Sequence, residues 1–203
     1  MSKKLRLTLA MGDYEIVRAL KEGIVQPDGI ELNVLTRMDS TTRHWRFLRN
    51  QDFDVAETSS SSYLVARDQG LPFEGIPVFL HRRFRHGFIF INTTKGIEKP
   101  TDLIGKKIGV KQYQSSAQLW MRGFLEHDYG LPHKSMEWYS ELDESVEIDL
   151  PSDLKLTRLP NELPIVGGTI TEEAQTPLAH VNVAAIARGT PNIAWPGASQ
   201  DAQ

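Results

Sequence analysis

Apolar and polar residues alternate at the start of the chain. Leu5, Leu7 and Leu9 alternate with polar residues, and this period of two predicts a β-strand rather than the unbroken apolar run of a signal peptide. Similar short apolar stretches bounded by turn residues predict the remaining strands. These lie at 30–34, 53–57, 75–80, 87–92, 107–110, 136–139, 154–159 and 165–170.

Segments with helix signals lie between these strands. The first follows Asp13, the expected N-cap residue, and its apolar positions are Ile16, Val17 and Leu20. The other predicted helices cover 44–49, 58–67, 115–129 and 179–188. The acidic stretch 141–153 is predicted to be a solvated loop. Strands and helices that alternate with short connections indicate an α/β fold with a mainly parallel sheet.

Composition narrows the possible functions. The 203 residues are 40% apolar and 24% charged, as in ordinary globular proteins. A net charge of −3 provides no field that would attract nucleic acid or an anionic membrane. The chain has no cysteine, which excludes disulfides and thiol chemistry. No metal-ligand spacing is found, so we expect no metal and no cofactor. Because the first segment is predicted to be a strand instead of a signal peptide, and no stretch has the roughly 20 apolar residues of a membrane span, the cytoplasm is the expected location.

Polar residues gather where three predicted strands give way to helices, at 12–15, 57–63 and 112–116. Ligands bind at such junctions because backbone N–H groups and helix dipoles point there. The candidate binding residues are Asp13, Tyr14, Ser59, Ser60, Ser61, Gln112, Tyr113, Ser115 and Ser116. The alternative is that they only cap helices, although four consecutive serines exceed what one cap needs.

Two further groups suit an anionic ligand or proton transfer. In the basic run HRRFRH at 81–86, Arg83 and Arg85 would face the same way on an extended chain, and a guanidinium binds carboxylates with two hydrogen bonds. The alternative is a solvated loop. Glu57 and His86 are the acid/base candidates. For Glu57 the alternative is a helix-cap acceptor or the partner of an arginine.

The order of these motifs carries a resemblance over about residues 5–160. LTLAMGDYE, FDVAETSSSSYLVARDQG and the stretch from IPVFLHRRFRHGF to FLEHDYGL resemble the 4,5-dihydroxyphthalate decarboxylase family. The resemblance implies a type II periplasmic-binding-protein-like fold with two lobes. Residues 1–94 would form an incomplete first lobe and 95–160 part of a second. The segment expected to return and complete the first lobe is missing, so the fold is expected to be incomplete.

The last part of the chain, 161–203, looks foreign to this pattern. Its stretch TPLAHVNV, within 164–196, resembles the swivelling phosphohistidine segment of phosphoenolpyruvate synthase-like enzymes. This resemblance implies that His180 carries a phosphoryl group, and the alternative is an ordinary histidine at a helix start. The other domains of those enzymes are absent, so phosphotransfer by this chain alone is not expected.

Three hypotheses on function follow. The first is a decarboxylase that converts a hydroxylated aromatic dicarboxylate, as in the conversion of 4,5-dihydroxyphthalate to protocatechuate. It implies a small aromatic carboxylate as ligand, with no nucleic-acid or membrane partner. The alternative is a non-catalytic solute-binding protein of the ABC-transporter type, and the third is a phosphotransfer fragment that uses His180. The oligomeric state is not predicted.

Overall fold

The computed structural model describes residues 3–81, 84–158, 168–170 and 193–194. The chain divides into two compact units. Unit 1 comprises residues 1–82 and 145–147, and unit 2 comprises 83–144 and 148–203. Arg83 and His180 lie outside the described residues, as does the predicted helix at 179–188.

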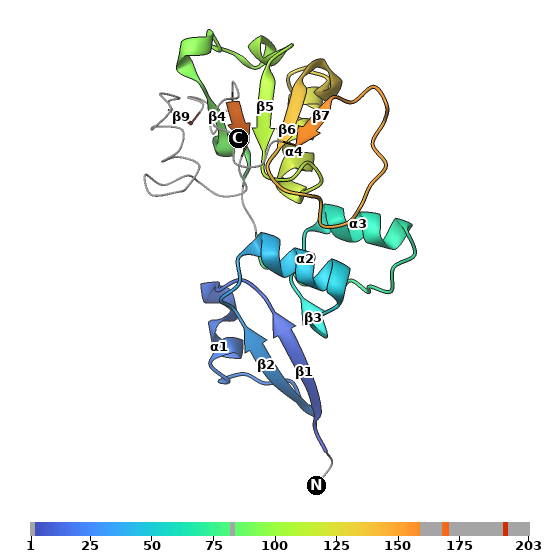
Figure 1. Ribbon diagram of the computed structural model, residues 1–203. Helices are drawn as coiled ribbons and strands as arrows, with labels where there is room; N and C mark the ends of the chain where they lie inside the picture. The colour runs from blue at the N-terminus through green and yellow to red at the C-terminus, as the bar shows by residue number, and fades with distance from the viewer. Residues whose placement is uncertain (1–2, 82–83, 159–167, 171–192, 195–203) are drawn as a thin grey trace. The chain divides into compact units, whose positions relative to one another are not determined.

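Unit 1 is built on a parallel sheet of three strands in the order β2-β1-β3 (Figure 1). Its strands are β1 (Leu5–Ala10), β2 (Ile30–Leu35) and β3 (Val55–Ala56). Its helical elements are η1 (Glu15–Val17), α1 (Arg18–Lys21), α2 (Ser40–Asn50) and α3 (Ser60–Asp68). This is the strand–helix alternation that the sequence predicts.

A short piece of the acidic stretch belongs to the core of unit 1. Val146 packs in a buried cluster with Leu48 of α2 and Ala66 of α3. The side chain of Gln69 donates a hydrogen bond of 2.6 Å to the carbonyl oxygen of Glu147. The prediction of a solvated loop over 141–153 is therefore wrong for this part, because apolar contacts and a hydrogen bond from a side chain to its backbone hold it.

Unit 2 is built on a sheet of six strands in the order β7-β6-β5-β8-β4-β9. The strands are β4 (Ile89–Ile91), β5 (Lys107–Val110), β6 (Glu137–Ser140), β7 (Leu156–Arg158), β8 (Gly168–Ile170) and β9 (Ile193–Ala194). Neighbours among β7, β6, β5 and β8 are parallel, whereas β4 is antiparallel to β8 and β9. Short 3₁₀ helices are η2 (His86–Phe88), η3 (Thr93–Lys95), η4 (Pro100–Leu103) and η5 (His133–Ser135).

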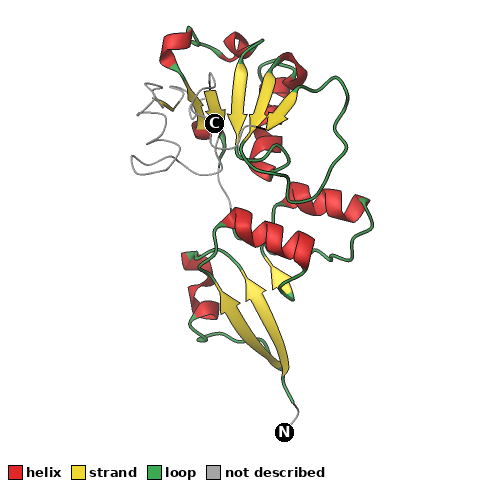
Figure 2. Cartoon of the chain, in the orientation of Figure 1, coloured by secondary structure: helices red, strands yellow, loops and turns green. Residues whose placement is uncertain are grey.

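The core of unit 2 lies between its sheet and α4 (Ser116–His127), which covers one face (Figure 2). Met121 and Leu125 of α4 pack with Trp138 of β6, and all three are buried. The indole N–H of Trp138 donates a hydrogen bond of 2.7 Å to the carbonyl oxygen of His133. Burial of the apolar face of an amphipathic helix thus fixes α4 on the sheet.

Two local predictions differ from the structure. Residues 75–80 form no strand. Pro77 has no N–H to donate, and Ile76 and Phe79 are both exposed, so neither face of the segment is covered. The helix after Gly12 also begins one residue later than predicted. Its N-cap residue is Tyr14, because the Asp13 carboxylate pairs with Lys21 at 2.8 Å instead of capping.

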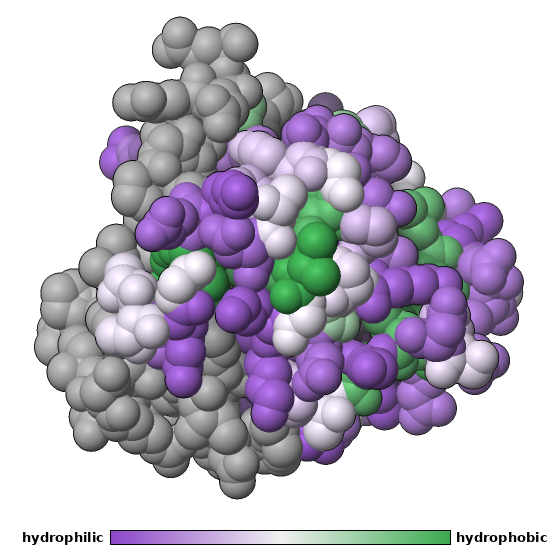
Figure 3. Space-filling view, turned by 90° about the horizontal axis from the view of Figure 1, so that it is seen from above, coloured by the Kyte–Doolittle hydropathy of each residue, from purple (hydrophilic) through white to green (hydrophobic). Residues whose placement is uncertain are grey.

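The surface shown in Figure 3 is mainly polar, and hydrophobic residues form small separate patches on it. Scattered patches of this kind are normal on folded proteins. Within the described ranges, no helix combines the length and the apolar character that a membrane crossing requires.

Substitution of two tryptophans tests which residues belong to the core of unit 2. Trp138 is 0% exposed and Trp120 is 60% exposed. We expect Trp138→Ala to lower the free energy of unfolding by about 3–5 kcal/mol, because it leaves a cavity in the core. Trp120→Ala should change it by about 0.5 kcal/mol or less. Urea unfolding of both variants measures the difference, and equal losses would contradict the assignment.

Candidate functional site

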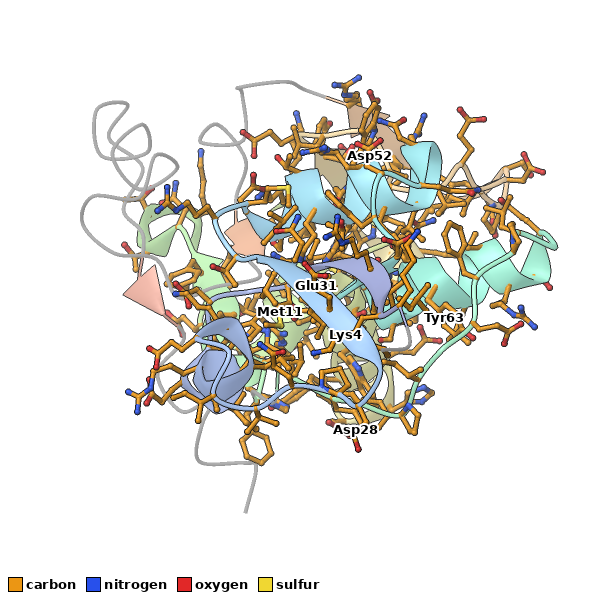
Figure 4. The ribbon with its side chains drawn as sticks, turned by 90° about the horizontal axis from the view of Figure 1, so that it is seen from below. Lys4, Met11, Asp28, Glu31, Asp52 and Tyr63 are labelled. Carbon is orange, nitrogen blue, oxygen red and sulfur yellow. The ribbon has the colours of Figure 1, made fainter. Side chains whose placement is uncertain are left out.

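The first candidate site lies at the carboxyl edge of the sheet in unit 1. β1 and β3 run parallel with Ala10 opposite Ala56, and the N–H of Glu57 donates to the carbonyl oxygen of Ala10 at 2.8 Å. Met11, labelled in Figure 4, follows β1 and precedes Gly12. The parallel register therefore brings Gly12 and Glu57 to the same edge, where ligands bind in open α/β sheets.

The Glu57 carboxylate accepts three hydrogen bonds at this edge. The backbone N–H of Gly12 and Nη2 of Arg43 both donate to Oε2 at 2.8 Å. The phenol of Tyr14 donates to Oε1 at 2.9 Å. The Glu57 side chain is only 15% exposed. The structure thus brings two of the predicted residues, Tyr14 and Glu57, into direct contact.

Arg43 of α2 is the partner that sequence reasoning did not identify. It is 2% exposed, and its guanidinium also donates to the carbonyl oxygens of Glu57 (3.3 Å) and Met38 (3.2 Å). A buried charge needs such pairing. One signal was available, because Arg43 lies four residues before Phe47 and so shares the face of the helix that packs inward.

Gly12 is required because the Tyr14 ring folds back over it. A Cβ atom at position 12 would overlap the ring and hydroxyl of Tyr14. The imidazole of His81 stacks with the Tyr14 ring at a centroid distance of 5.5 Å. Glycine therefore permits the close approach that carries the phenol to Glu57.

A second candidate site lies at the start of α4 in unit 2. The Glu144 carboxylate accepts the backbone N–H groups of Tyr113 (2.7 Å) and Gln114 (2.8 Å). Arg122 of α4 donates to the carbonyl oxygen of Tyr113 at 2.6 Å, and its guanidinium lies 3.7 Å from the centroid of the Tyr113 ring. The side chain of Gln112 donates to the carbonyl oxygen of Asp143.

Burial dominates the electrostatics of this second site. It raises the pKa of Glu144, although the two N–H groups and the charge of Arg122 act in the opposite direction. Burial also lowers the pKa of Arg122 and raises that of Tyr113. Sequence reasoning missed Glu144, because it lies 31 residues from Tyr113 in a stretch that reads as a solvated loop.

The serines at the two helix starts do not act as ordinary caps. Ser59 and Ser115 are the N-cap residues of α3 and α4, and neither side chain makes a capping hydrogen bond. The hydroxyls of Ser59 and Ser61 instead bond each other at 2.9 Å. Ser115 is 5% exposed, and within the described part of the chain its Oγ has no hydrogen-bond partner. Capping alone therefore does not account for these residues.

Four further predicted residues are Ser60, Ser116, His86 and Arg85. Ser60 is exposed, and Ser116 is the first residue of α4. His86 stacks on Phe124 at a centroid distance of 4.2 Å. Phe124 lies about 12 Å along the axis of α4 from its first residue, so this contact is two turns away from the helix start. The Arg85 guanidinium lies 5.6 Å from the centroid of the Phe88 ring.

Among the residues that the structure describes, no group of three or more His, Asp or Glu side chains is arranged to hold a metal ion.

Solved structures define the class of fold. The alkanesulfonate-binding protein SsuA from Xanthomonas axonopodis pv. citri matches with a TM-score of 0.55 and 13% identity, over 84% of this chain and 55% of that chain. The periplasmic aliphatic sulphonate binding protein SsuA from Escherichia coli matches with a TM-score of 0.50 and 15% identity, over 94% and 59% respectively. The chain thus has the α/β fold of periplasmic binding proteins.

Sequence comparison defines the family. The NMT1/THI5 like family matches residues 15–138. A 4,5-dihydroxyphthalate decarboxylase from Pseudomonas putida is 34% identical over 199 residues, which cover 95% of this chain and 77% of that protein. A second one, from Comamonas testosteroni, is 37% identical over 164 residues, 77% of this chain and 49% of that protein. The chain belongs to the NMT1/THI5-like family and to the same family as the Pseudomonas putida relative.

The comparisons give no support to the resemblance of the tail to a phosphohistidine segment. The alignment with the Pseudomonas putida protein covers 95% of the chain, so it extends into the part that follows residue 160. The role of His180 stays a prediction.

The close approach of Tyr14 to Gly12 leads to a test by substitution. We expect Gly12→Ala to lower the free energy of unfolding by about 1–3 kcal/mol, because the added methyl group must displace the Tyr14 ring. In a Tyr14→Ala background the same substitution should cost much less. Gly123→Ala is the control, since nothing lies near its added Cβ. Equal costs in both backgrounds would contradict the steric explanation.

The pKa of Glu144 leads to a test by pH. Because burial raises its pKa in the folded protein, the stability that this proton contributes is fully present below pH 4.5 and is lost as the pH rises through the folded-state pKa. Glu144→Gln removes the titration, so the variant should gain stability relative to the wild type as the pH rises. Urea unfolding on both sides of pH 4.5 measures this difference.

Glu126→Gln is the matched control with the opposite sign. The hydrogen bond with His133 lowers the pKa of Glu126, so its contribution is present above pH 4.5 and is lost as the pH falls. This variant should therefore lose stability relative to the wild type as the pH rises. The same trend in both variants would show that the assigned environments are wrong.

Proposed function

We propose that this chain is a decarboxylase that removes one carboxylate of a hydroxylated aromatic dicarboxylate as CO2, in the manner of 4,5-dihydroxyphthalate conversion to protocatechuate. Two relatives at 34% and 37% identity carry that activity in their names. The observation that carries the proposal is the contact between Tyr14 and Glu57 at the carboxyl edge of a parallel sheet. A carboxylate and a phenol in contact there can exchange a proton with a bound ligand.

The chemistry of the substrate defines what the protein must provide. In 4,5-dihydroxyphthalate each carboxylate is para to a hydroxyl group. Loss of the hydroxyl proton directs electron density to the ring carbon that bears the carboxylate, and that carbon then takes up a proton. The bond to the carboxylate breaks, its electron pair returns to the ring, and CO2 leaves. The hydroxyl oxygen then takes back its proton, so the net change replaces CO2 with one proton. The protein therefore needs an acid/base group and donors for the retained carboxylate.

In this proposal Glu57 is the acid/base residue of unit 1. It exchanges a proton with the ligand directly or along the hydrogen bond from Tyr14. Two helix starts supply donors suited to a carboxylate, each within its own unit. One is the start of α3 with Ser59 and Ser61, and the other is the start of α4 with the buried hydroxyl of Ser115.

A second candidate function is the binding of a small anion without catalysis. The match to the two SsuA proteins supports it, because the names of those proteins describe binding of sulfonates and their fold is that of this chain. A thermal shift with aromatic dicarboxylates but no turnover would favour this function over the first.

The cytoplasmic location also stays a prediction, which fractionation of cells that produce the protein would test.

The proposed reaction is tested by incubation with 4,5-dihydroxyphthalate and measurement of CO2 and protocatechuate. We expect both products from the wild type, and a kcat about 10²–10⁴-fold lower for Glu57→Gln, which removes the acid/base group. Glu74→Gln is the control, because Glu74 is an exposed residue of the same unit. Neither product from the folded wild-type protein would overturn the proposal.

A further inference from the structure

We propose that Arg43 is a positioning residue of the site in unit 1: it supplies the positive charge for Glu57 and fixes the direction in which that carboxylate faces Tyr14. The inference rests on the proposed function, since it assigns Arg43 a role in the same reaction. Arg43 is 2% exposed, so it has almost no surface on which a ligand could bind. Its effect must therefore pass through Glu57.

The guanidinium binds Glu57 at both its main chain and its side chain. Nε donates to the carbonyl oxygen at 3.3 Å, and Nη2 donates to Oε2 at 2.8 Å. Nη1 donates to the carbonyl oxygen of Met38, just before α2. The rigid, planar fork of arginine suits such contacts, which a lysine could not reproduce together. Arg43 thus fixes the residue that follows β3 relative to the start of α2.

The division of donors between the two carboxylate oxygens gives the site its direction. Oε2 accepts from Arg43 and from the N–H of Gly12, whereas Oε1 accepts from Tyr14. Two donors on one oxygen prevent rotation of the carboxylate, so the other oxygen stays directed toward the phenol. The groups that face this carboxylate are therefore a guanidinium, a backbone N–H and a phenol, and the phenol is stacked with His81.

Stability alone does not explain the ion pair. Replacing a buried ion pair by apolar residues of similar size is often neutral or stabilising. A pair placed at the edge of the sheet where ligands bind, with Tyr14 as its third member, is better explained by a role in the reaction. This explanation makes a distinct prediction, because a residue that acts only through Glu57 should have no further effect once Glu57 is neutral.

A double-mutant cycle on the full chain tests this prediction. We expect Arg43→Met to lower kcat by at least about 10²-fold, close to the effect of Glu57→Gln. The double variant should be no slower than Glu57→Gln alone, and Arg43→Lys should recover part of the activity. Arg46→Met is the matched control on the same helix, because Arg46 is 42% exposed and pairs with Asp52. Effects of Arg43→Met and Glu57→Gln that multiply in the double variant would overturn the proposal.

An NMR measurement tests the same proposal without turnover. With ¹³C at the Cζ atoms of tyrosine, the Tyr14 resonance is assigned from its loss in Tyr14→Phe. Arg43→Met and Glu57→Gln should each shift this resonance, because each changes the acceptor that Tyr14 faces, and Arg46→Met should leave it unchanged. No shift in Arg43→Met would overturn the positioning role. No turnover by a wild type whose Tyr14 resonance responds as expected would overturn only the decarboxylase proposal.

The double variant also covers the case in which Arg43→Met does not fold. It leaves no unpaired charge in the interior, so it should fold even where the single variant fails. Its Tyr14 resonance should then match that of Glu57→Gln. A clear difference between these two spectra would show that Arg43 acts on Tyr14 by another route and would overturn the proposal.

Discussion

The ion pair between Arg43 and Glu57 connects the parts of unit 1 on which its site depends. Arg43 comes from α2, Glu57 follows β3, and the N–H group that shares Oε2 follows β1. Charges that leave water must be paired and hydrogen-bonded, or their burial costs several kcal/mol each. The position of α2 over the carboxyl edge of the sheet is therefore constrained by chemistry as well as by apolar contacts. The geometry of the Tyr14 phenol depends in turn on this constraint.

Unit 2 also holds a buried carboxylate, but with other groups. Glu144 is held by two backbone N–H groups at the start of α4, and Arg122 bonds a neighbouring carbonyl oxygen. Burial outweighs the two N–H groups and the charge of Arg122, so the pKa of Glu144 rises. A helix start that already attracts one carboxylate of the protein has the electrostatic character that an anionic ligand needs.

Local patterns predicted much of the fold. The strand at 107–110 and the helix over most of 115–129 follow directly from apolar periodicity and turn residues. The prediction of a strand at 75–80 was wrong, because the composition of this segment favours a strand while no neighbouring strand pairs with it. Tyr14 and Glu57 were found because both follow predicted strands. Arg43 and Glu144 were not, since their contacts link residues 14 and 31 positions apart in the sequence.

The two serine-bearing helix starts explain why pattern alone left both capping and binding open. An N-cap serine normally bonds a backbone N–H of the first turn, and a sequence cannot show whether that bond forms. Here neither Ser59 nor Ser115 makes it. A buried hydroxyl without a partner costs about 1–3 kcal/mol, and Ser115 Oγ has none within the part of the chain that the structure describes. A ligand carboxylate at the start of α4 would offset that cost, which a capping role leaves unexplained.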